Sequence, residues 1–392
     1  MTPLVQAEQA LLGAVLLEPS QLEKLTPWLQ PSHFYRPAHQ ALFAAALKLH
    51  ADRHPAVGLA VGESVPLAWL SDTVAVAGTQ TRGITSSYAH LLVSACPRPE
   101  HAVIYGRMVL EGAIHRAVAQ HATRLHQAAR ADAVRGGTEE TIRQADILTE
   151  ALGDLSRRWG TDARPAPASP SAVPPGPVPK EYDEHLLADE EFLLACLSTR
   201  PEQLGDVVGW LHPADFTDAG HQQIYQSLGA LHHRGEPIDQ LTVLWEVQRR
   251  GALSDRTLEA DRVMRICDGS SFGGSAEHYG ERLVRASLLR TAADAAGRVR
   301  TLSDDESLAA GSLINHALDA LGPLDQVRRR WKAATGAGPG PVQPTRTTAA
   351  TSPQRADAAL TRSRPTRSAG AQSATPAHHP TSPPRGSRRS PS

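Results

Sequence analysis

Histidine and cysteine are the residues of this chain that could hold a metal ion, because imidazole nitrogen and thiolate sulfur are common zinc ligands. The sequence has 18 histidines and 3 cysteines. The motifs H-E-x-x-H and C-x-x-C are absent, and Cys96, Cys196 and Cys267 lie far apart. The adjacent side chains of His232 and His233 diverge on a helix. We therefore expect no metal site, no cofactor and no disulfide framework, as in a reducing cytoplasm.

Paired carboxylates could act as a general acid and base, and two pairs, Glu139-Glu140 and Asp304-Asp305, fall in predicted first helical turns. The helix dipole stabilises carboxylates there, which explains both pairs without catalysis. No cysteine–histidine pairing indicates a nucleophile. We expect no catalytic residues.

Phosphate transfer would require a G-x-x-x-x-G-K-[ST] loop, whose backbone amides cradle the phosphates while the lysine reaches the terminal ones. The four lysines are Lys24, Lys48, Lys180 and Lys332, and none follows a glycine. The printed sequence contains no such loop, so we expect no ATPase or helicase activity from this chain alone.

Two arginine pairs, Arg157-Arg158 and Arg329-Arg330, each precede a tryptophan. The arginines could bind nucleic-acid phosphates while the indole stacks on a base. Alternatively, these are solvated helix ends whose cations complement the C-terminal dipole, and we favour this interpretation.

The C-terminal stretch 335–392 is also basic, with eight arginines and one acid, Asp357. It could contact DNA weakly and in a salt-sensitive manner, or it could serve only to keep the chain soluble. Its Pro, Ser, Thr and Ala content predicts disorder.

The elements that would position these residues belong to a segment that occurs twice. Residues 8–55 align without a gap onto a second segment 182 residues later, with 15 identities in 48 columns. The scarce aromatic residues Trp28 and Phe34 match Trp210 and Phe216. We predict a duplicated domain in which these four side chains close a helical core. The same alignment matches His39 with His221. We expect both histidines at the edge of the core, each bonded to a neighbouring carbonyl.

The composition favours helices, because alanine is abundant and aromatic residues are few. The formal charge of −1 creates no global field that would attract nucleic acid or an anionic membrane. No run of about 18 apolar residues and no signal-like N-terminal segment occurs. We predict an all-α, cytoplasmic protein that does not enter membranes.

Each copy is expected to end in a hairpin of two long helices. Apolar residues recur every three or four positions on the second helix of each hairpin, and such a seam requires a partner helix. The expected interface residues are Ala145, Leu148, Leu152 and Leu155 in the first copy and Ile314, Ala317, Leu321 and Leu324 in the second. The two seams could pair with each other, with a second chain or with another protein.

Several polar residues are expected at helix starts, where free backbone amides need acceptors. Glu8 is placed in the first turn of its helix, and Thr138 and Asp239 are predicted N-caps. The sequence from Ser303 to Glu306 reads as a capping box for the last helix. Ser64 is a further candidate cap.

These features divide the chain into four parts. The first copy covers residues 1–160, and the second, better preserved copy covers 184–332. Between them, 161–183 is rich in proline and should be an extended, semi-rigid linker. Residues 333–392 form the tail.

Three sets of residues carry a family resemblance: Gln6-Ala7-Glu8-Gln9 before a leucine-rich helix, Phe34-Tyr35 followed by His39, and Gly235 to Leu244 as a variant of G-x-P-I-D-x-x-T-L. Because of these motifs, each copy resembles the N-terminal domain of the DnaB family of replicative DNA helicases. The first copy departs from the pattern by keeping only Pro55 of the third motif. The resemblance implies a helical head followed by a helical hairpin. In the family this domain precedes a RecA-like ATPase motor, whose phosphate loop is missing from the printed sequence.

The resemblance also implies that hairpins pair and that heads contact other replication proteins. We therefore expect a non-catalytic assembly protein of DNA replication, whose partners are the replicative helicase, primase or itself. A nucleic-acid-binding accessory protein that uses the basic tail is the alternative. An enzyme with an unrecognised site is a third, disfavoured hypothesis.

Overall fold

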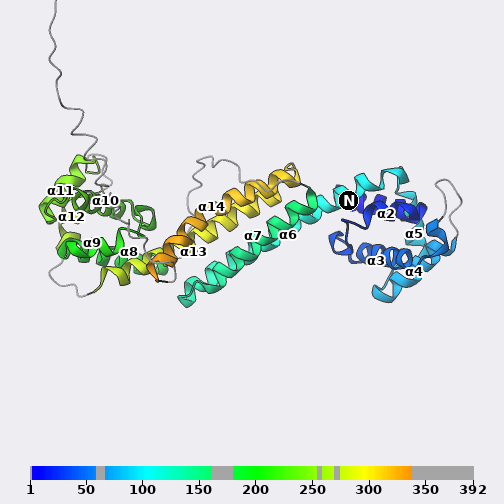
Figure 1. Cartoon of the computed structure of the whole chain (residues 1–392), viewed down its shortest axis with the longest axis horizontal. Coiled ribbons are helices and arrows are strands. Elements are labelled where there is room, and N and C mark those ends of the chain that lie inside the picture. The colour runs from blue at the N-terminus through cyan, green and yellow to red at the C-terminus, as the bar shows by residue number, and fades with distance from the viewer. Residues whose placement is uncertain (1, 59–66, 161–179, 254–257, 269–273, 337–392) are drawn as a thin grey trace, which may run out of the picture. The chain divides into compact units, whose positions relative to one another are not determined.

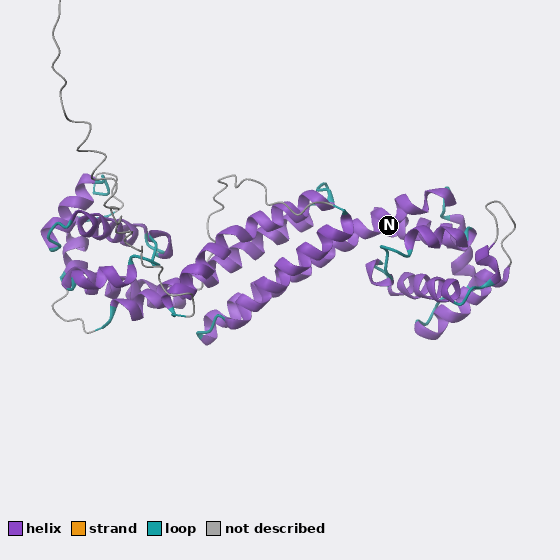
Figure 2. Ribbon diagram, in the orientation of Figure 1, coloured by secondary structure: helices purple, strands orange, loops and turns teal. Residues whose placement is uncertain are grey.

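The computed structural model describes residues 2–58, 67–160, 180–253, 258–268 and 274–336, with side chains omitted at 180–183. These residues form fourteen α-helices and six short 3₁₀ helices, and none of them lies in a strand (Figures 1 and 2). The predicted all-α fold is confirmed. The linker residues 161–179 and the tail from 337 onward lie outside the described residues.

The first copy consists of a head and a hairpin. The head contains α1 (Pro3–Leu17), α2 (Leu22–Leu25), α3 (Pro37–Ala51), α4 (Leu67–Gln80) and α5 (Ser86–Ser94). The 3₁₀ helices η1 (Pro19–Gln21), η2 (Pro31–His33), η3 (Pro55–Gly58) and η4 (Pro99–His101) connect them. The hairpin is formed by α6 (Ala102–Arg135) and α7 (Glu139–Trp159).

The second copy repeats this order. Its head contains α8 (Lys180–Thr199), η5 (Pro201–Gln203), α9 (Leu204–Val207), η6 (Pro213–Asp215), α10 (Ala219–Arg234), α11 (Gln240–Arg249) and α12 (Ala260–Cys267). Its hairpin is formed by α13 (Ala276–Asp304) and α14 (Ala310–Ala334). Because α8 begins at Lys180, helix already covers the last residues of the predicted linker.

The heads pack around the aromatic residues that the repeat preserves. Phe34 and Phe216 are fully buried, whereas Trp28 and Trp210 are half-buried at the joint between head and hairpin. Each indole lies against a glycine in the first helix of the hairpin of its own copy. A Cβ atom added at Gly280 would lie 2.6 Å from the Trp210 ring, so a larger residue would push the hairpin away from the head.

The first hairpin turns through a glycine with positive φ. At Gly136 φ is +80°, a left-handed conformation that ends α6 without the steric cost that a side chain would add. The returning helix is capped from inside the same copy. Asp132 accepts hydrogen bonds from the backbone N–H and the hydroxyl of Thr141, each at 2.8 Å, whereas the Thr138 side chain makes no capping bond.

The second copy confirms one predicted cap and contradicts another. Asp239 accepts hydrogen bonds from Leu241 N–H at 2.8 Å and Thr242 N–H at 2.9 Å. The capping box at residues 303–306 was wrong. Residues 303 and 304 still belong to α13, and α14 starts only at Ala310. The hydroxyl of Ser303 donates to the carbonyl of Arg300 within α13 and caps no helix start.

The two heads differ in their fourth helix. In the first copy α4 buries Trp69, whose indole N–H donates to the carbonyl of Val15 at 3.3 Å. In the second copy α11 leaves Trp245 63% exposed. The candidate cap Ser64 lies outside the described residues. Across the described part of the chain, no helix has the length and apolar character needed to cross a membrane.

Candidate functional site

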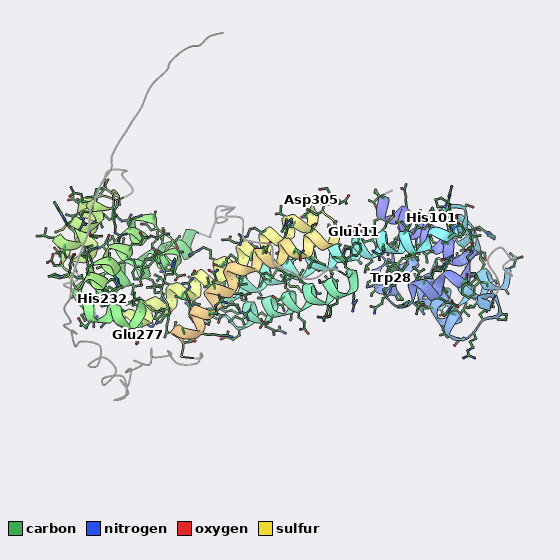
Figure 3. The ribbon with its side chains drawn as sticks, turned by 45° about the horizontal axis from the view of Figure 1, so that its top comes forward. Trp28, His101, Glu111, His232, Glu277 and Asp305 are labelled. Carbon is green, nitrogen blue, oxygen red and sulfur yellow. The ribbon has the colours of Figure 1, made fainter. Side chains whose placement is uncertain are left out.

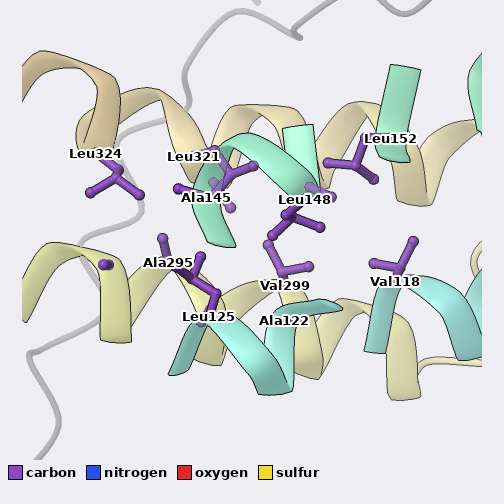
Figure 4. Packing of buried hydrophobic residues seen from close by; sticks show 14 of the residues in the cluster. Val118, Ala122, Leu125, Ala145, Leu148, Leu152, Ala295, Val299, Leu321 and Leu324 are labelled. Atoms are coloured by element: carbon purple, nitrogen blue, oxygen red, sulfur yellow. The ribbon is translucent and has the colours of Figure 1, made fainter. Parts of the chain in front are cut away.

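The two hairpins of one chain pack against each other and form a four-helix bundle. Helix α13 lies against α6, and α14 lies against α7. All predicted interface residues are buried except the half-buried Leu155. Figure 4 shows Leu148 beside Val299 of the other copy. Of the three arrangements left open by the sequence, the structure has the seams paired within one chain.

Polar contacts between the copies surround this apolar bundle. Arg328 of α14 forms an ion pair with Asp146 of α7 at 2.6 Å. The guanidinium of Arg285 donates to the Gly136 carbonyl at 3.0 Å. The Glu111 carboxylate accepts from the N–H of Ala310 at 3.0 Å, and Figure 3 shows Glu111 beside the turn that carries Asp305.

A histidine completes the contact at the second hairpin turn. His115 Nδ1 lies 3.0 Å from the Ser303 carbonyl oxygen, and Nε2 lies 3.0 Å from that of Leu308. Both acceptors are carbonyls, and a neutral imidazole offers only one N–H. The contact is therefore fully satisfied only when both ring nitrogens carry a proton.

A buried carboxylate–histidine pair organises each head. In the first copy Glu8 and His39 are fully buried, with Glu8 Oε2 2.6 Å from His39 Nδ1. Glu8 Oε1 accepts from the N–H of Tyr35, and the Tyr88 hydroxyl lies 2.7 Å from His39 Nε2. The pair thereby fastens α1 to the start of α3. The prediction of Glu8 in a first helical turn was wrong, since it is the sixth residue of α1.

The second copy keeps the pair and changes its outer partner. Glu190 Oε2 lies 2.6 Å from His221 Nδ1, and Arg262 donates to His221 Nε2 at 2.9 Å. Because Nε2 accepts, Nδ1 must carry the proton that is shared with Glu190. The prediction that these histidines bond to carbonyls was wrong in both copies, since a carboxylate is the acceptor. Their burial requires such a partner.

The arginine pairs before Trp159 and Trp331 have different surroundings in the two copies. Arg330 forms an ion pair with the fully buried Asp215, which holds η6 against the end of α14. The structure thus engages Arg330 internally and does not leave it free for phosphate. The equivalent Arg158 faces His33 in place of Asp215, and His33 is also buried. Burial, followed by the charges of Arg158 and Arg116, lowers the pKa of His33 to about 4.

The remaining two arginines of these motifs lie on the surface. Arg157 is exposed and pairs with Asp154 on its own helix, and Arg329 is exposed. The phosphate contacts predicted for Arg157, Arg158 and Arg329 remain predictions.

Exposed apolar side chains gather on α11 of the second head. Leu241 is 69% exposed and Trp245 is 63% exposed, and both line a shallow groove with Leu231 and Arg249. Contiguous exposed apolar surface of this kind marks interaction sites in soluble proteins. The sequence alone did not single out this groove, although Leu and Trp four residues apart on one helix were a usable signal.

The first head exposes a different apolar surface. Ile104 and Met108, one turn apart near the start of α6, are each about half exposed. Met108 also lines a groove with Pro3 of α1 and Tyr105. The two heads therefore present non-equivalent surfaces.

No group of three or more histidine, cysteine or acidic side chains that could hold a metal exists among the described residues. The site residues that sequence reasoning missed are Glu8, Glu190, Asp215 and the cross-copy contacts. For the glutamates a signal was available, because a charged residue kept in both copies beside a kept histidine indicates a buried pair.

Comparison with known proteins gives the family. The model of the DnaB-like helicase N terminal domain matches residues 2–111 and 183–283. The chain is similar to the replicative DNA helicase DnaB of Geobacillus stearothermophilus, with 37% identity over 124 residues, which are 31% of this chain and 25% of that protein. No solved structure gave a significant match.

Other relatives are also replicative helicases. The DnaB of Mycobacterium leprae is 30% identical over 155 residues, or 39% of this chain and 24% of the relative. The helicase DnaC of Bacillus subtilis is 32% identical over 162 residues, or 41% of this chain and 32% of the relative. The matches thus span a quarter to a third of each relative. Since the domain model covers more than half of this chain, in two separate segments, the chain belongs to the family of the DnaB-like helicase N-terminal domain.

Proposed function

We propose that this protein is a non-catalytic assembly protein of DNA replication, acting in the cytoplasm, whose two heads contact the replicative helicase or primase. The family match and the replicative helicases among its relatives support the link to replication. The absence of a phosphate-binding loop from the printed sequence supports a role without ATP hydrolysis.

The observation that carries this proposal is the pairing of the hairpins within one chain. The predicted seams are buried inside the four-helix bundle, so their apolar area is not free for a partner. The heads remain as the surfaces available to other proteins. Because they differ in their exposed side chains, they can bind two different partners, or one partner at two places.

The groove on α11 is the contact surface that we propose on the second head. An exposed tryptophan beside a leucine is the kind of anchor that dominates protein–protein affinity once a partner removes it from water. Arg234, Arg249 and Arg250 surround Glu246 next to the groove, and Glu236 pairs with Arg234. This rim offers polar groups that can fix the orientation of a partner.

The test is co-elution of the purified full-length chain with the helicase and the primase of the same cell, with the mass of each complex measured by light scattering. We expect a complex with at least one of them. Trp245→Ala should weaken it about tenfold to a hundredfold, the loss expected of an anchor residue. Leu67→Ser, which changes an exposed leucine of α4, is the matched control. Absence of any complex would contradict the proposal.

Two further measurements separate the alternatives. ATP hydrolysis by the purified chain, with and without single-stranded DNA, should not exceed the blank. Removal of residues 335–392 should leave partner binding unchanged. If the same deletion abolished DNA binding while no protein partner could be found, the alternative of a DNA-binding accessory protein would be favoured.

A further inference from the structure

The two hairpins use equivalent positions to contact each other, but with opposite charges. The shift of 174 residues that aligns Tyr105 and Gly106 with Tyr279 and Gly280 also places Glu111 on Arg285. Each of these two residues reaches the turn of the opposite hairpin. The positions correspond, whereas the chemistry is reversed.

Each charge matches the helix end that it meets. Glu111 accepts from Ala310 N–H, the first amide of α14, where the helix dipole is positive. Arg285 donates to the carbonyl of Gly136, which follows the last residue of α6, where the dipole is negative. Neither residue could replace the other, because a carboxylate cannot donate to a carbonyl and a guanidinium cannot accept from an amide.

The need for these caps also differs between the turns. In the first copy, Asp132 already serves the N-terminus of α7 from within its own hairpin. In the second copy, the corresponding position is Glu306, which is exposed. The start of α14 therefore depends on Glu111, with His115 bonded to the carbonyls of Ser303 and Leu308 of the same turn.

A second asymmetric contact lies along the bundle. Arg328 and Asp146 form the ion pair between α14 and α7. Aligning Trp159 with Trp331 places Arg328 on Ser156 and Asp146 on Leu318. The symmetry-related contact is therefore uncharged, and only one arrangement of the hairpins brings the two charges together.

If two first-copy hairpins or two second-copy hairpins paired with each other, all of these groups would be mismatched. We call this the pairing of like hairpins. Two first-copy hairpins would each direct Glu111 toward a Gly136 carbonyl, and two second-copy hairpins would direct Arg285 toward the amides at the start of α14. Arg328, whose side chain is only 15% exposed, would face Leu318 without its cross-copy carboxylate. Such unpaired charges disfavour the pairing of like hairpins and so discriminate between partners.

We propose that Glu111, Arg285 and the Asp146–Arg328 pair are specificity determinants that make the hairpin of the first copy bind only the hairpin of the second. The chain is thereby a closed pseudo-dimer whose hairpins do not pair like with like. This inference does not depend on which protein the heads bind.

A charge-swap cycle on the full-length chain tests the contact. Asp146→Arg and Arg328→Asp should each lower the midpoint of thermal unfolding by about 2 to 4 °C, and the double variant should recover most of the loss. No recovery in the double variant would overturn the assigned pairing.

A chemical cross-link identifies the pairing directly. In an Arg328→Lys chain, a carbodiimide should join Lys at 328 to Asp146 within the monomer, as identified by mass spectrometry. Asp325, which lies 3.3 Å from Arg328 on the same helix, is the internal control for the reagent. A link to Asp325 without any link to Asp146 would contradict the proposal.

The double reversal Glu111→Arg with Arg285→Glu tests specificity. Within one chain, the double variant places the wrong charge at both turns. Between two chains, it places a matching charge at the turns whenever two first-copy hairpins or two second-copy hairpins pair. We expect the wild-type chain to have the mass of a monomer and the double variant to form dimers as its concentration rises. The control Arg107→Glu with Glu281→Arg swaps another equivalent pair, and no contact of either residue with the opposite copy is seen in the described structure. Dimers in the control, or none in the double reversal, would overturn the inference.

Discussion

The two heads share their buried polar centre and differ at its edge. Both hold a glutamate–histidine pair at 2.6 Å, but the outer nitrogen of the histidine meets the hydroxyl of Tyr88 in the first head and the guanidinium of Arg262 in the second. A buried charge cannot be changed without a simultaneous change of its partner, whereas a partner near the surface can be exchanged. The comparison shows which contacts define the fold and which are free to diverge.

The fourth helix shows the same division on the surface. The first head buries Trp69 against α1, and the second head turns Trp245 outward. A tryptophan contributes to a core in one copy and to a candidate binding surface in the other. Duplication within one chain permits this difference, because one copy can keep the fold while the other copy gains a surface.

The largest expected effect comes from the shared centre. Glu8→Leu or Glu190→Leu should each lower the free energy of unfolding by about 3 to 5 kcal/mol, because the buried histidine and the adjacent backbone amide lose their acceptor. The measurement is urea denaturation of the full-length chain. Gln6→Leu, on the exposed face of α1, should change the value by less than about 0.5 kcal/mol. A small loss in one copy alone would show that the two centres are not equivalent.

The next largest loss of stability should differ between the two copies. Arg330→Leu should destabilise the protein by about 2 to 3 kcal/mol, because it leaves Asp215 buried without its cation. Arg158→Leu, at the equivalent exposed position, should cost less than about 0.5 kcal/mol. Both are measured by urea denaturation, and the double variant Arg330→Leu with Asp215→Leu should recover part of the loss. Equal losses for the two single variants would contradict the assigned ion pair.

A smaller effect is expected at the caps. Asp239→Ala should cost about 1 kcal/mol, since Leu241 and Thr242 lose the acceptor for their amides. Hydrogen exchange should become faster at these two amides. In the first head, Thr85→Ala removes a single bond to Tyr88 N–H at 3.2 Å and should cost less. Unchanged exchange in the Asp239 variant would argue against its capping role.

The last effect concerns pH. His33 has a pKa of about 4 in the folded chain, below its ordinary value of 6.5, so folding favours the neutral ring. Its stabilising contribution is present above pH 6.5 and is lost as the pH falls toward 4, because the unfolded chain binds the proton more readily. His33→Asp introduces the residue of the second copy, which can pair with Arg158. Thermal unfolding between pH 4 and 7 should show a smaller loss on acidification in this variant than in wild type, with His33→Gln as the uncharged control.

The helices and the repeat could be predicted from the sequence because their signals are local. The apolar period on α7 and α14 identified the buried face, and Asp239 before a helical run identified a cap. The buried pairs could not be predicted in the same way. Glu8 and His39 lie 31 residues apart in the sequence, and only the packing of α1 against α3 decides that both are removed from water.

The sequence by itself determined that the chain is helical, that it carries one fold twice, and that each hairpin has an apolar seam, because periodicity and repetition are written along the chain. Only the tertiary structure decided that the two seams cover each other, that Arg330 belongs to Asp215, and that Glu111 and Arg285 meet opposite helix ends. Periodicity specifies that a helix face must be covered, whereas the geometry and charge of the surrounding residues decide which surface covers it.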